Sequence, residues 1–272
     1  MIFTFFVQIA FSFTTTYDMQ GHSYQTYQVH KNTPLVVLFH GCRQNADDFY
    51  TLTNGSDRQI NATIVYANQN PLFNVYNCWN WFYSYNQAAF IGSELDTINH
   101  KILSFKKQYS ATSVHLVGFS SGAGIVSNLV FTYPKTFKSA LIHSGPAFGL
   151  AKTGSQAITL LKKGDLGTDA LAPITPIQTT AKTIVLVQGK KDKVVNPNNQ
   201  NILVQQFSYF LKIPVYPDQR KRFQEFSSQQ NRIIIWRLPT AHEWSGGNPS
   251  SEYSAPNEID ILDNYYSSVV GI

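Results

Sequence analysis

The segment Gly118-Phe119-Ser120-Ser121-Gly122 places a serine between two glycines. It follows an apolar run at 114–117 and precedes small residues at 123–130, which together predict a strand, a sharp turn and a helix. Glycines two residues to either side of Ser120 allow a tight turn that a Cβ would obstruct. The turn would expose the Ser120 hydroxyl beside the first helical N–H groups. A structural turn is the alternative, but this setting favours a nucleophile and predicts a serine hydrolase.

A serine nucleophile needs a carboxylate and a base, and the sequence offers several of each. Asp192 follows the apolar run 183–188, so it would lie at the carboxyl end of a strand, where the acid of such a triad belongs. A solvated turn is its alternative role. Other aspartates lie in an irregular segment or on the expected last helix, and these are Asp165, Asp169, Asp260 and Asp263. The sequence therefore favours Asp192.

His242 is the candidate base because the order nucleophile, acid, histidine requires a histidine downstream of Asp192. It lies in the glycine-rich segment 241–247, although a loop histidine can also be exposed and inert. His143 ends the strand after the serine turn and could line the site, but it precedes the acid. Four others lie in expected strands, helices or the first hairpin: His22, His30, His100 and His115. We predict Ser120, Asp192 and His242 as the catalytic residues.

The tetrahedral intermediate of such a reaction needs two N–H donors for its oxyanion. One should be the main-chain N–H of Ser121, the residue after the nucleophile. The other should come from a loop that follows an early strand, and residues 40–42 occupy that place. Gly41 allows close backbone approach, so we predict the N–H of Cys42 as the second donor. A purely structural turn is the alternative.

Alternating apolar runs and helical patterns predict an α/β fold, with a mostly parallel central sheet and helices on both faces. Residues 14–32 read as a hairpin about Gly21. Expected strands lie at 34–39, 62–67, 113–117, 139–143, 183–188 and 232–238, and expected helices at 93–109, 120–133, 198–211 and 256–270. Residues 145–181 contain glycines and prolines that predict an irregular excursion. We expect residues 14–272 to form a single catalytic domain.

The composition excludes some functions. The net charge is +5, but the basic residues are scattered, so the stripe expected of a nucleic-acid binder is missing. No apolar segment reaches the length of about 18 residues that a membrane-spanning helix needs.

Residues 1–13 are mostly apolar and predict either a remnant of a secretory signal or a first strand.

Cys42 and Cys78 are the only two cysteines, and both lie in expected loops. They could be two free buried thiols. A disulfide between them would instead stabilise the fold by about 3–4 kcal/mol in the chain-entropy model, and would require an oxidising compartment. The cysteines therefore point, like residues 1–13, to a secreted or periplasmic protein.

The chain resembles the polyhydroxybutyrate depolymerase-like esterases, an α/β-hydrolase family that also includes feruloyl and acetylxylan esterases. The resemblance runs from about residue 34 to the C-terminus. Seven motifs carry it, at 38–44, 77–82, 118–122, 133–134, 143–145, 189–195 and 242–247. It implies Ser120 as nucleophile, Asp192 as acid and His242 as base, and it also implies a Cys42–Cys78 disulfide.

The sequence departs from this family in two places. Ser121 stands where alanine is usual, which leaves its main-chain N–H unaffected. Many secreted members carry a linker and a polymer-binding domain that this sequence does not contain, so we expect attack on oligomers and amorphous polymer rather than on crystalline polymer.

Aromatic residues near the expected site could contact substrate. A disulfide at Cys78 would hold Trp79 and Trp81 at the rim of the cleft, where a flat apolar wall would suit a polyester or an aromatic acyl group. Trp244 and His143 are further candidates for substrate contact. The alternative for all of these residues is packing in the core or in a loop.

The sequence thus predicts a secreted serine ester hydrolase that acts on hydroxyalkanoate esters, namely polyhydroxybutyrate or its oligomers. A feruloyl or acetylxylan esterase is the alternative, because both chemistries use one triad. A binding protein on an inactive hydrolase scaffold is a remoter alternative. We expect no cofactor, no metal and no obligate protein partner.

Overall fold

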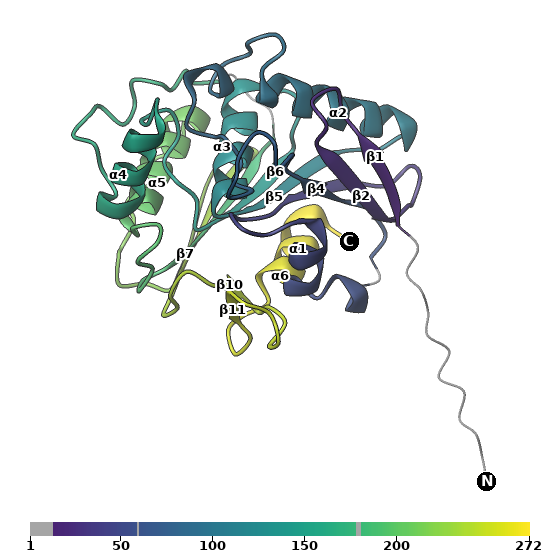
Figure 1. Cartoon of the computed structure of the whole chain (residues 1–272). Coiled ribbons are helices and arrows are strands. Elements are labelled where there is room, and N and C mark those ends of the chain that lie inside the picture. The colour runs from purple at the N-terminus through teal and green to yellow at the C-terminus, as the bar shows by residue number, and fades with distance from the viewer. Residues whose placement is uncertain (1–12, 59, 178–180) are drawn as a thin grey trace.

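The computed structural model of the chain describes residues 13–58, 60–177 and 181–272 (Figure 1). The expected signal remnant or first strand at 1–13 therefore lies outside the described residues, except for Phe13. None of the helices in the described ranges is both long and apolar enough to cross a membrane.

A nine-stranded sheet runs through the molecule in the order β1-β2-β4-β3-β5-β6-β7-β9-β8 (Figure 1). The six strands from β4 to β9 in this order are parallel, while β1 and β2 at one edge and β8 at the other are antiparallel to their neighbours. The strands are β1 Thr14–Tyr17, β2 Ser23–Gln28, β3 Leu35–Phe39, β4 Thr63–Asn68, β5 Val114–Phe119, β6 Ser139–His143, β7 Thr183–Gly189, β8 Phe223–Ser228 and β9 Asn231–Leu238. A separate parallel pair joins β10 Trp244–Ser245 to β11 Ser254–Ala255.

Helices cover both faces of this sheet, because its central strands are apolar on both sides. In β3, Leu35 and Phe39 pack into one core with α2 Glu94–Gln108, α3 Ser121–Thr132 and α5 Asn198–Leu211. Val36 and Leu38 face the other core, with α1 Ala46–Leu52 and α6 Ile261–Tyr265. The mostly parallel α/β architecture expected from the sequence is confirmed.

The structure also contains elements that the sequence pattern did not predict. Helix α4, Gly154–Lys163, lies within the segment expected to be irregular, and it buries Ala157 and Leu160. Helix α1 and the edge strand β8 were likewise not predicted. The expected last helix at 256–270 is shorter: α6 begins after its N-cap Asp260, and a π-helical turn follows at Tyr266–Val270. Short 3-10 turns lie at Gly55–Asp57 and Ser84–Asn86.

Candidate active site

Ser120 sits at a strained turn between β5 and α3. Its φ and ψ angles are 54° and −117°, in a region that side chains rarely adopt. The turn is held by its N–H, which donates to the His143 carbonyl at 2.9 Å. Both flanking glycines are required sterically: a Cβ at Gly118 would lie 2.4 Å from the Gly122 carbonyl oxygen, and one at Gly122 would lie 2.2 Å from the Phe39 oxygen. The sharp strand-turn-helix geometry expected from the sequence is present.

The loops after β7 and β9 are joined to each other, and this brings the acid and the base together. The N–H groups of Lys190 and Lys191 donate to the carbonyls of Leu238 and Thr240 at 2.7 and 2.9 Å. The backbones come so close at Gly189 that a Cβ there would lie 2.2 Å from the carbonyl oxygen of residue 241. A glycine at this point is therefore needed for the approach of the two loops.

Ser120, His242 and Asp192 form one continuous hydrogen-bonded chain. His242 Nε2 lies 3.0 Å from Ser120 Oγ, and His242 Nδ1 lies 2.8 Å from Asp192 Oδ2. All three side chains are largely buried, and the ring of Phe119 stacks on the imidazole at 5.1 Å between centroids. The structure thus brings together the three residues that the sequence singled out.

Asp192 is held in its ionised form. Burial alone would raise its pKa, but hydrogen bonds from His242 and from the N–H groups of Val194 and Val195 outweigh burial, and the pKa lies below its ordinary value. The two N–H groups donate to Oδ1 at 2.9 and 2.8 Å, and Gln188 Nε2 donates to Oδ2 at 2.9 Å. An ionised, fixed Asp192 would orient the His242 ring and stabilise its protonated form.

The predicted oxyanion donors both border the same space. Cys42 and Ser121 line the pocket beside Ser120. In the described part of the chain, neither main-chain N–H donates to another protein group, so both are available to a ligand oxygen. The loop is fixed by the Gln44 side chain, whose Oε1 accepts from the Gly41 N–H at 2.9 Å.

The disulfide implied by the family resemblance is present. Cys42 and Cys78 are bonded, with their Cα atoms 4.2 Å apart. The N–H of Arg43 also donates to the Tyr76 carbonyl at 2.8 Å. The loop that carries the Cys42 N–H is therefore bound to the aromatic segment after β4 by the disulfide and by a main-chain hydrogen bond beside it.

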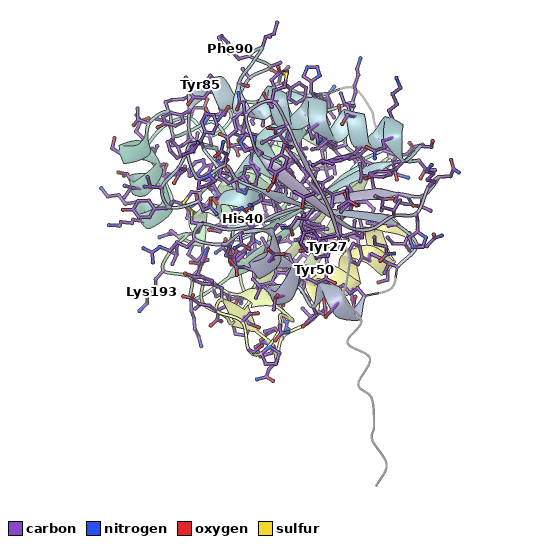
Figure 2. The ribbon with its side chains drawn as sticks, turned by 45° about the vertical axis from the view of Figure 1, so that its right-hand side comes forward. Tyr27, His40, Tyr50, Tyr85, Phe90 and Lys193 are labelled. Atoms are coloured by element: carbon purple, nitrogen blue, oxygen red, sulfur yellow. A yellow bond between two sulfur atoms is a disulfide. The ribbon has the colours of Figure 1, made fainter. Side chains whose placement is uncertain are left out.

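Lys193 lies at the periphery of the molecule (Figure 2), whereas His40, at the start of this loop, is fully buried. Its Nδ1 lies 2.7 Å from the Gly41 carbonyl, which can only accept, and its Nε2 accepts from the Gln69 N–H at 3.2 Å. The ring is therefore neutral with its proton on Nδ1. Burial lowers the pKa of His40 to about 4, which agrees with this state.

A pocket of about 310 Å³ opens beside Ser120, within the size range of small-molecule sites. One wall is the loop at Gly41, Cys42 and Arg43. The remaining lining is mostly apolar and comes from Trp81, Phe119, Leu161, Val194, Val195, His242 and Tyr253. The pocket can hold the acyl part of an ester with its carbonyl near Ser120.

Of the four residues expected to contact substrate, only Trp81 lines this pocket. Trp79 is fully buried, and its ring packs edge-on against Phe39 at 5.2 Å. Trp244 is also fully buried, in the core beneath α1, where it packs against Phe49. The expectation of substrate contact is therefore corrected for Trp79 and Trp244, which support the site from behind.

His143 also lies behind the site rather than in it. It is fully buried, its Nε2 accepts from the Ser245 N–H at 3.3 Å, and its ring stacks on Trp244 at 5.0 Å. Burial, with a smaller effect of the neighbouring His242, lowers the pKa of His143 to about 3, so the ring is neutral. Its expected role as a substrate contact is corrected, and its carbonyl instead fixes the Ser120 turn.

The alternative acids and bases lie in other settings. Asp260 caps α6 and pairs with Arg58 at 2.7 Å. Asp165 and Asp169 accept hydrogen bonds from nearby backbone N–H groups in their own turns. His115 lies between two serine hydroxyls near the start of β5.

The chain matches a family of known proteins. The model of the family described as "Esterase PHB depolymerase" matches residues 24–220. The chain belongs to this family. Its disulfide and its serine turn both fall within the matched residues.

Two curated relatives match the chain. Poly(3-hydroxyalkanoate) depolymerase C of Paucimonas lemoignei is 28% identical over 88% of this chain and 55% of its own length. Feruloyl esterase B of Thermothelomyces thermophilus is 25% identical over 61% of this chain and 52% of its own length. The chain thus spans about half the length of the curated relatives it matches.

Solved structures share the fold at low sequence identity. An acetyl xylan esterase from Aspergillus awamori superposes with a TM-score of 0.71 at 16% identity, covering 85% of this chain and 94% of that one. A carboxylesterase from Bacillus cereus gives a TM-score of 0.54 at 15% identity, covering 91% and 93% of the two chains. These matches establish the α/β-hydrolase fold for this family member.

Some residues that shape the site were not predicted from the sequence. Gln188, which holds the Asp192 carboxylate, is a polar residue near the end of an otherwise apolar buried strand, and that contrast was its available signal. Leu161 comes from α4, which was not expected, so no sequence pattern pointed to it. Arg43 and Tyr253 both adopt positive φ angles at the rim, which only the backbone reveals.

Proposed function

We propose that the chain is a serine carboxylic-ester hydrolase that cleaves hydroxyalkanoate esters, such as polyhydroxybutyrate or its oligomers. One observation carries the reaction type: His242 lies within hydrogen-bonding distance of both Ser120 Oγ and Asp192, beside an apolar pocket. Membership of the esterase family and the likeness to a poly(3-hydroxyalkanoate) depolymerase support the substrate class.

The reaction begins when His242 Nε2 accepts the Ser120 proton as Oγ attacks the ester carbonyl. The carbonyl oxygen becomes an oxyanion, which the N–H groups of Cys42 and Ser121 stabilise. Asp192 stabilises the imidazolium through Nδ1. When the intermediate collapses, the C–O bond to the alcohol breaks and Nε2 protonates the leaving oxygen. Water then attacks the acyl-enzyme in the same way, releasing the acid and restoring Ser120.

A second candidate is an esterase that removes feruloyl or acetyl groups from a polysaccharide. A specific observation favours it: a polar pocket of about 390 Å³ adjoins the catalytic pocket and shares Arg43 and Tyr253 with it. Its other walls include Asp48, Ser250 and Glu252. Hydroxyl and carboxylate groups of this kind can hydrogen-bond to a sugar. Because the Tyr253 ring lies 6.4 Å from that of His242, a sugar in this pocket would lie on the leaving-group side.

The Cys42–Cys78 disulfide supports a proposal about the cellular compartment in which the protein works. A disulfide persists in oxidising compartments, so we propose that the protein works outside the cytoplasm, secreted or periplasmic.

Two experiments test these proposals. A fluorophosphonate probe should label Ser120 in the wild type and fail to label Ser120→Ala; a wild type that stays unlabelled would favour a binding protein on an inactive scaffold. Hydrolysis of hydroxybutyrate trimer, amorphous polymer, methyl ferulate and acetylated xylan should then be compared. Release of hydroxybutyrate supports the proposed substrate, whereas turnover of ferulate or acetylxylan alone would select the second candidate.

A further inference from the structure

A second group of ionisable side chains lies buried outside the catalytic pocket, between the first hairpin and the start of α2. His22 is fully buried, with Nδ1 2.8 Å from Asp18 Oδ2 and Nε2 3.7 Å from Glu94 Oε1. Tyr24 also donates to Asp18 at 2.8 Å. The proposed reaction uses none of these residues. Because burial of charge is costly without compensation, this cluster needs an explanation.

Glu94 accepts one side-chain amide at each of its two oxygens. Gln69 Nε2 donates to Oε1 at 2.6 Å, and Asn86 Nδ2 donates to Oε2 at 2.9 Å. Glu94 is 5% exposed, while Gln69 and Asn86 are fully buried. A single carboxylate therefore fixes two amides that come from opposite ends of the segment between β4 and α2.

The hydrogen bonds of Gln69 connect Glu94 to the oxyanion loop, and we call these contacts the Gln69 arm. Its Nε2 also donates to the Cys78 carbonyl at 3.1 Å, and its main-chain N–H donates to His40 Nε2 at 3.2 Å. His40 in turn donates through Nδ1 to the Gly41 carbonyl at 2.7 Å, one residue before Cys42. Gln69 thus holds both the disulfide partner of Cys42 and the histidine that hydrogen-bonds to the carbonyl of the peptide unit carrying the Cys42 N–H.

The hydrogen bonds of Asn86, which we call the Asn86 arm, connect Glu94 to the wall of the pocket at Trp81. Asn86 Nδ2 also donates to the Asn80 carbonyl at 2.9 Å, next to Trp81. Asn128, on the helix that begins after Ser120, donates to the carbonyls of Trp81 and Asn86 at 2.8 and 2.6 Å. The Asn86 arm therefore ties the Trp81 wall to the helix that follows the nucleophile.

We propose that Glu94 is a positioning residue, which acts through Gln69 on the Cys42 N–H and through Asn86 on the Trp81 wall. The inference rests on the proposed function, because it assigns Cys42 to the oxyanion site. Glu94 stands at the first position of α2, where the helix dipole favours a carboxylate, and His22 supplies the cation beside it. The carboxyl group of Glu94 offers one oxygen to each of the two amides, whereas a glutamine side chain at this position would offer a single oxygen.

Two variants test this inference. Glu94→Gln keeps the shape but presents an NH₂ group to one of the two amide donors, which releases one arm. Gln69→Met removes the arm to Cys78 at similar volume. Because complete loss of an oxyanion donor costs about 10²–10³ in kcat, we expect loosening to lower kcat on p-nitrophenyl acetate by about tenfold in each variant. KM should stay within about twofold, since this small acyl group makes few pocket contacts.

A double variant and a matched control separate positioning from general destabilisation. Glu94→Gln with Gln69→Met should lose little more kcat than either single variant, because both break one chain of contacts. His115→Asn disrupts another buried polar pair, near the start of β5, where Nδ1 lies 2.6 Å from Ser139 Oγ. It should lower the melting temperature and leave kcat unchanged.

The outcomes are distinct. A selective loss of kcat in both single variants supports the inference, and Gln69→Met alone decides if Glu94→Gln does not fold. Wild-type kcat in the folded variants, with only a lower melting temperature as in His115→Asn, would overturn it while leaving the proposed function intact. A wild type that neither hydrolyses the ester nor reacts with a fluorophosphonate would overturn both.

Discussion

The indole Nε1 of Trp79 donates a hydrogen bond to the main-chain carbonyl of His40 at 3.1 Å. The donor follows Cys78 directly, and the acceptor lies two residues before Cys42. This hydrogen bond therefore joins the same two segments as the disulfide does. Trp81, two positions further on, turns instead to the catalytic pocket. The two tryptophans therefore make separate contributions, one to the backbone of the loop and one to the wall of the pocket.

We expect these contributions to appear in different kinetic constants. Trp79→Phe keeps an aromatic ring but leaves the buried His40 carbonyl without its donor, which should cost about 1–3 kcal/mol of stability and lower kcat.

Trp81→Ala should raise KM for a hydroxybutyrate trimer more than for p-nitrophenyl acetate, because the longer substrate loses more apolar contact. Steady-state kinetics on both substrates checks this. Equal effects of Trp81→Ala on both would contradict it.

Ser120→Ala should abolish ester hydrolysis, while Ser121→Ala should keep most of it. Loss of a triad nucleophile costs roughly 10⁴–10⁶ in kcat. Ser121 is needed for its main-chain N–H, which alanine retains, and its buried hydroxyl has no hydrogen-bond partner among the described residues. Single-turnover assays of the two variants measure the difference, and similar activity in both would refute the assignment of the nucleophile.

Asp192→Asn should lose about 10⁴ in kcat without unfolding, because asparagine can favour the wrong tautomer of His242. Asp169→Asn is the matched control, since among the described residues its carboxylate accepts only within its own turn, from the Leu171 N–H at 2.9 Å. Activity and circular dichroism should be measured together. Greater sensitivity at Asp169 than at Asp192 would show that the acid is misassigned.

Replacing Cys42 and Cys78 with serine should lower both stability and kcat. The bond joins residues 36 positions apart, and the chain-entropy model gives about 3–4 kcal/mol for such a loop. Denaturant unfolding measures the first effect. We expect kcat to fall more than KM rises. The Cys42 N–H would lose the disulfide that positions it, whereas the residues that line the pocket would be unchanged.

Stability should fall at alkaline pH because of His22. Burial opposes its charge, but Asp18 and Glu94 outweigh burial and raise the pKa of His22 to about 9, against 6.5 in the unfolded chain. Its contribution is therefore complete below about pH 6.5 and is lost as the pH rises through about 9. Tyr24, the other titratable group in contact with Asp18, has a pKa raised well above 10 by burial and stays neutral in this window.

The measurement is the free energy of unfolding between pH 6 and pH 10 for the wild type and His22→Gln. The wild-type curve should fall over this range, and the variant should lie lower at neutral pH and vary less. Parallel curves would show that His22 is neutral in the folded protein.

The sequence predicted most of the central sheet, because each parallel strand is buried on both faces and appears as a short apolar run. It also singled out Ser120, Asp192 and His242, which the structure places in one hydrogen-bonded chain, because chain order and strand ends restrict where each can lie. The serine turn was predicted for the same reason that the structure requires it: Gly118 lies where β5 nearly touches α3, and Gly122 lies where α3 nearly touches the end of β3.

Other features depended on tertiary contacts that no local pattern records. Trp79, Trp81 and Trp244 are chemically alike in sequence, and only packing decides which of them reaches the pocket. Helix α4 was missed because glycines and prolines surround it, although it buries Leu160. Glu94 looked like an ordinary residue in the first turn of a helix, and its two amide partners lie 25 and 8 positions away.

The Cys42–Cys78 bond also has a consequence for the cell that makes the protein. A newly synthesised chain in a reducing cytosol would carry two thiols, and its oxyanion loop would lack that tether. We expect such a chain to be a poor catalyst until oxidation closes the bond. The same two sulfur atoms that brace the fold would then delay ester cleavage until the chain reaches an oxidising compartment.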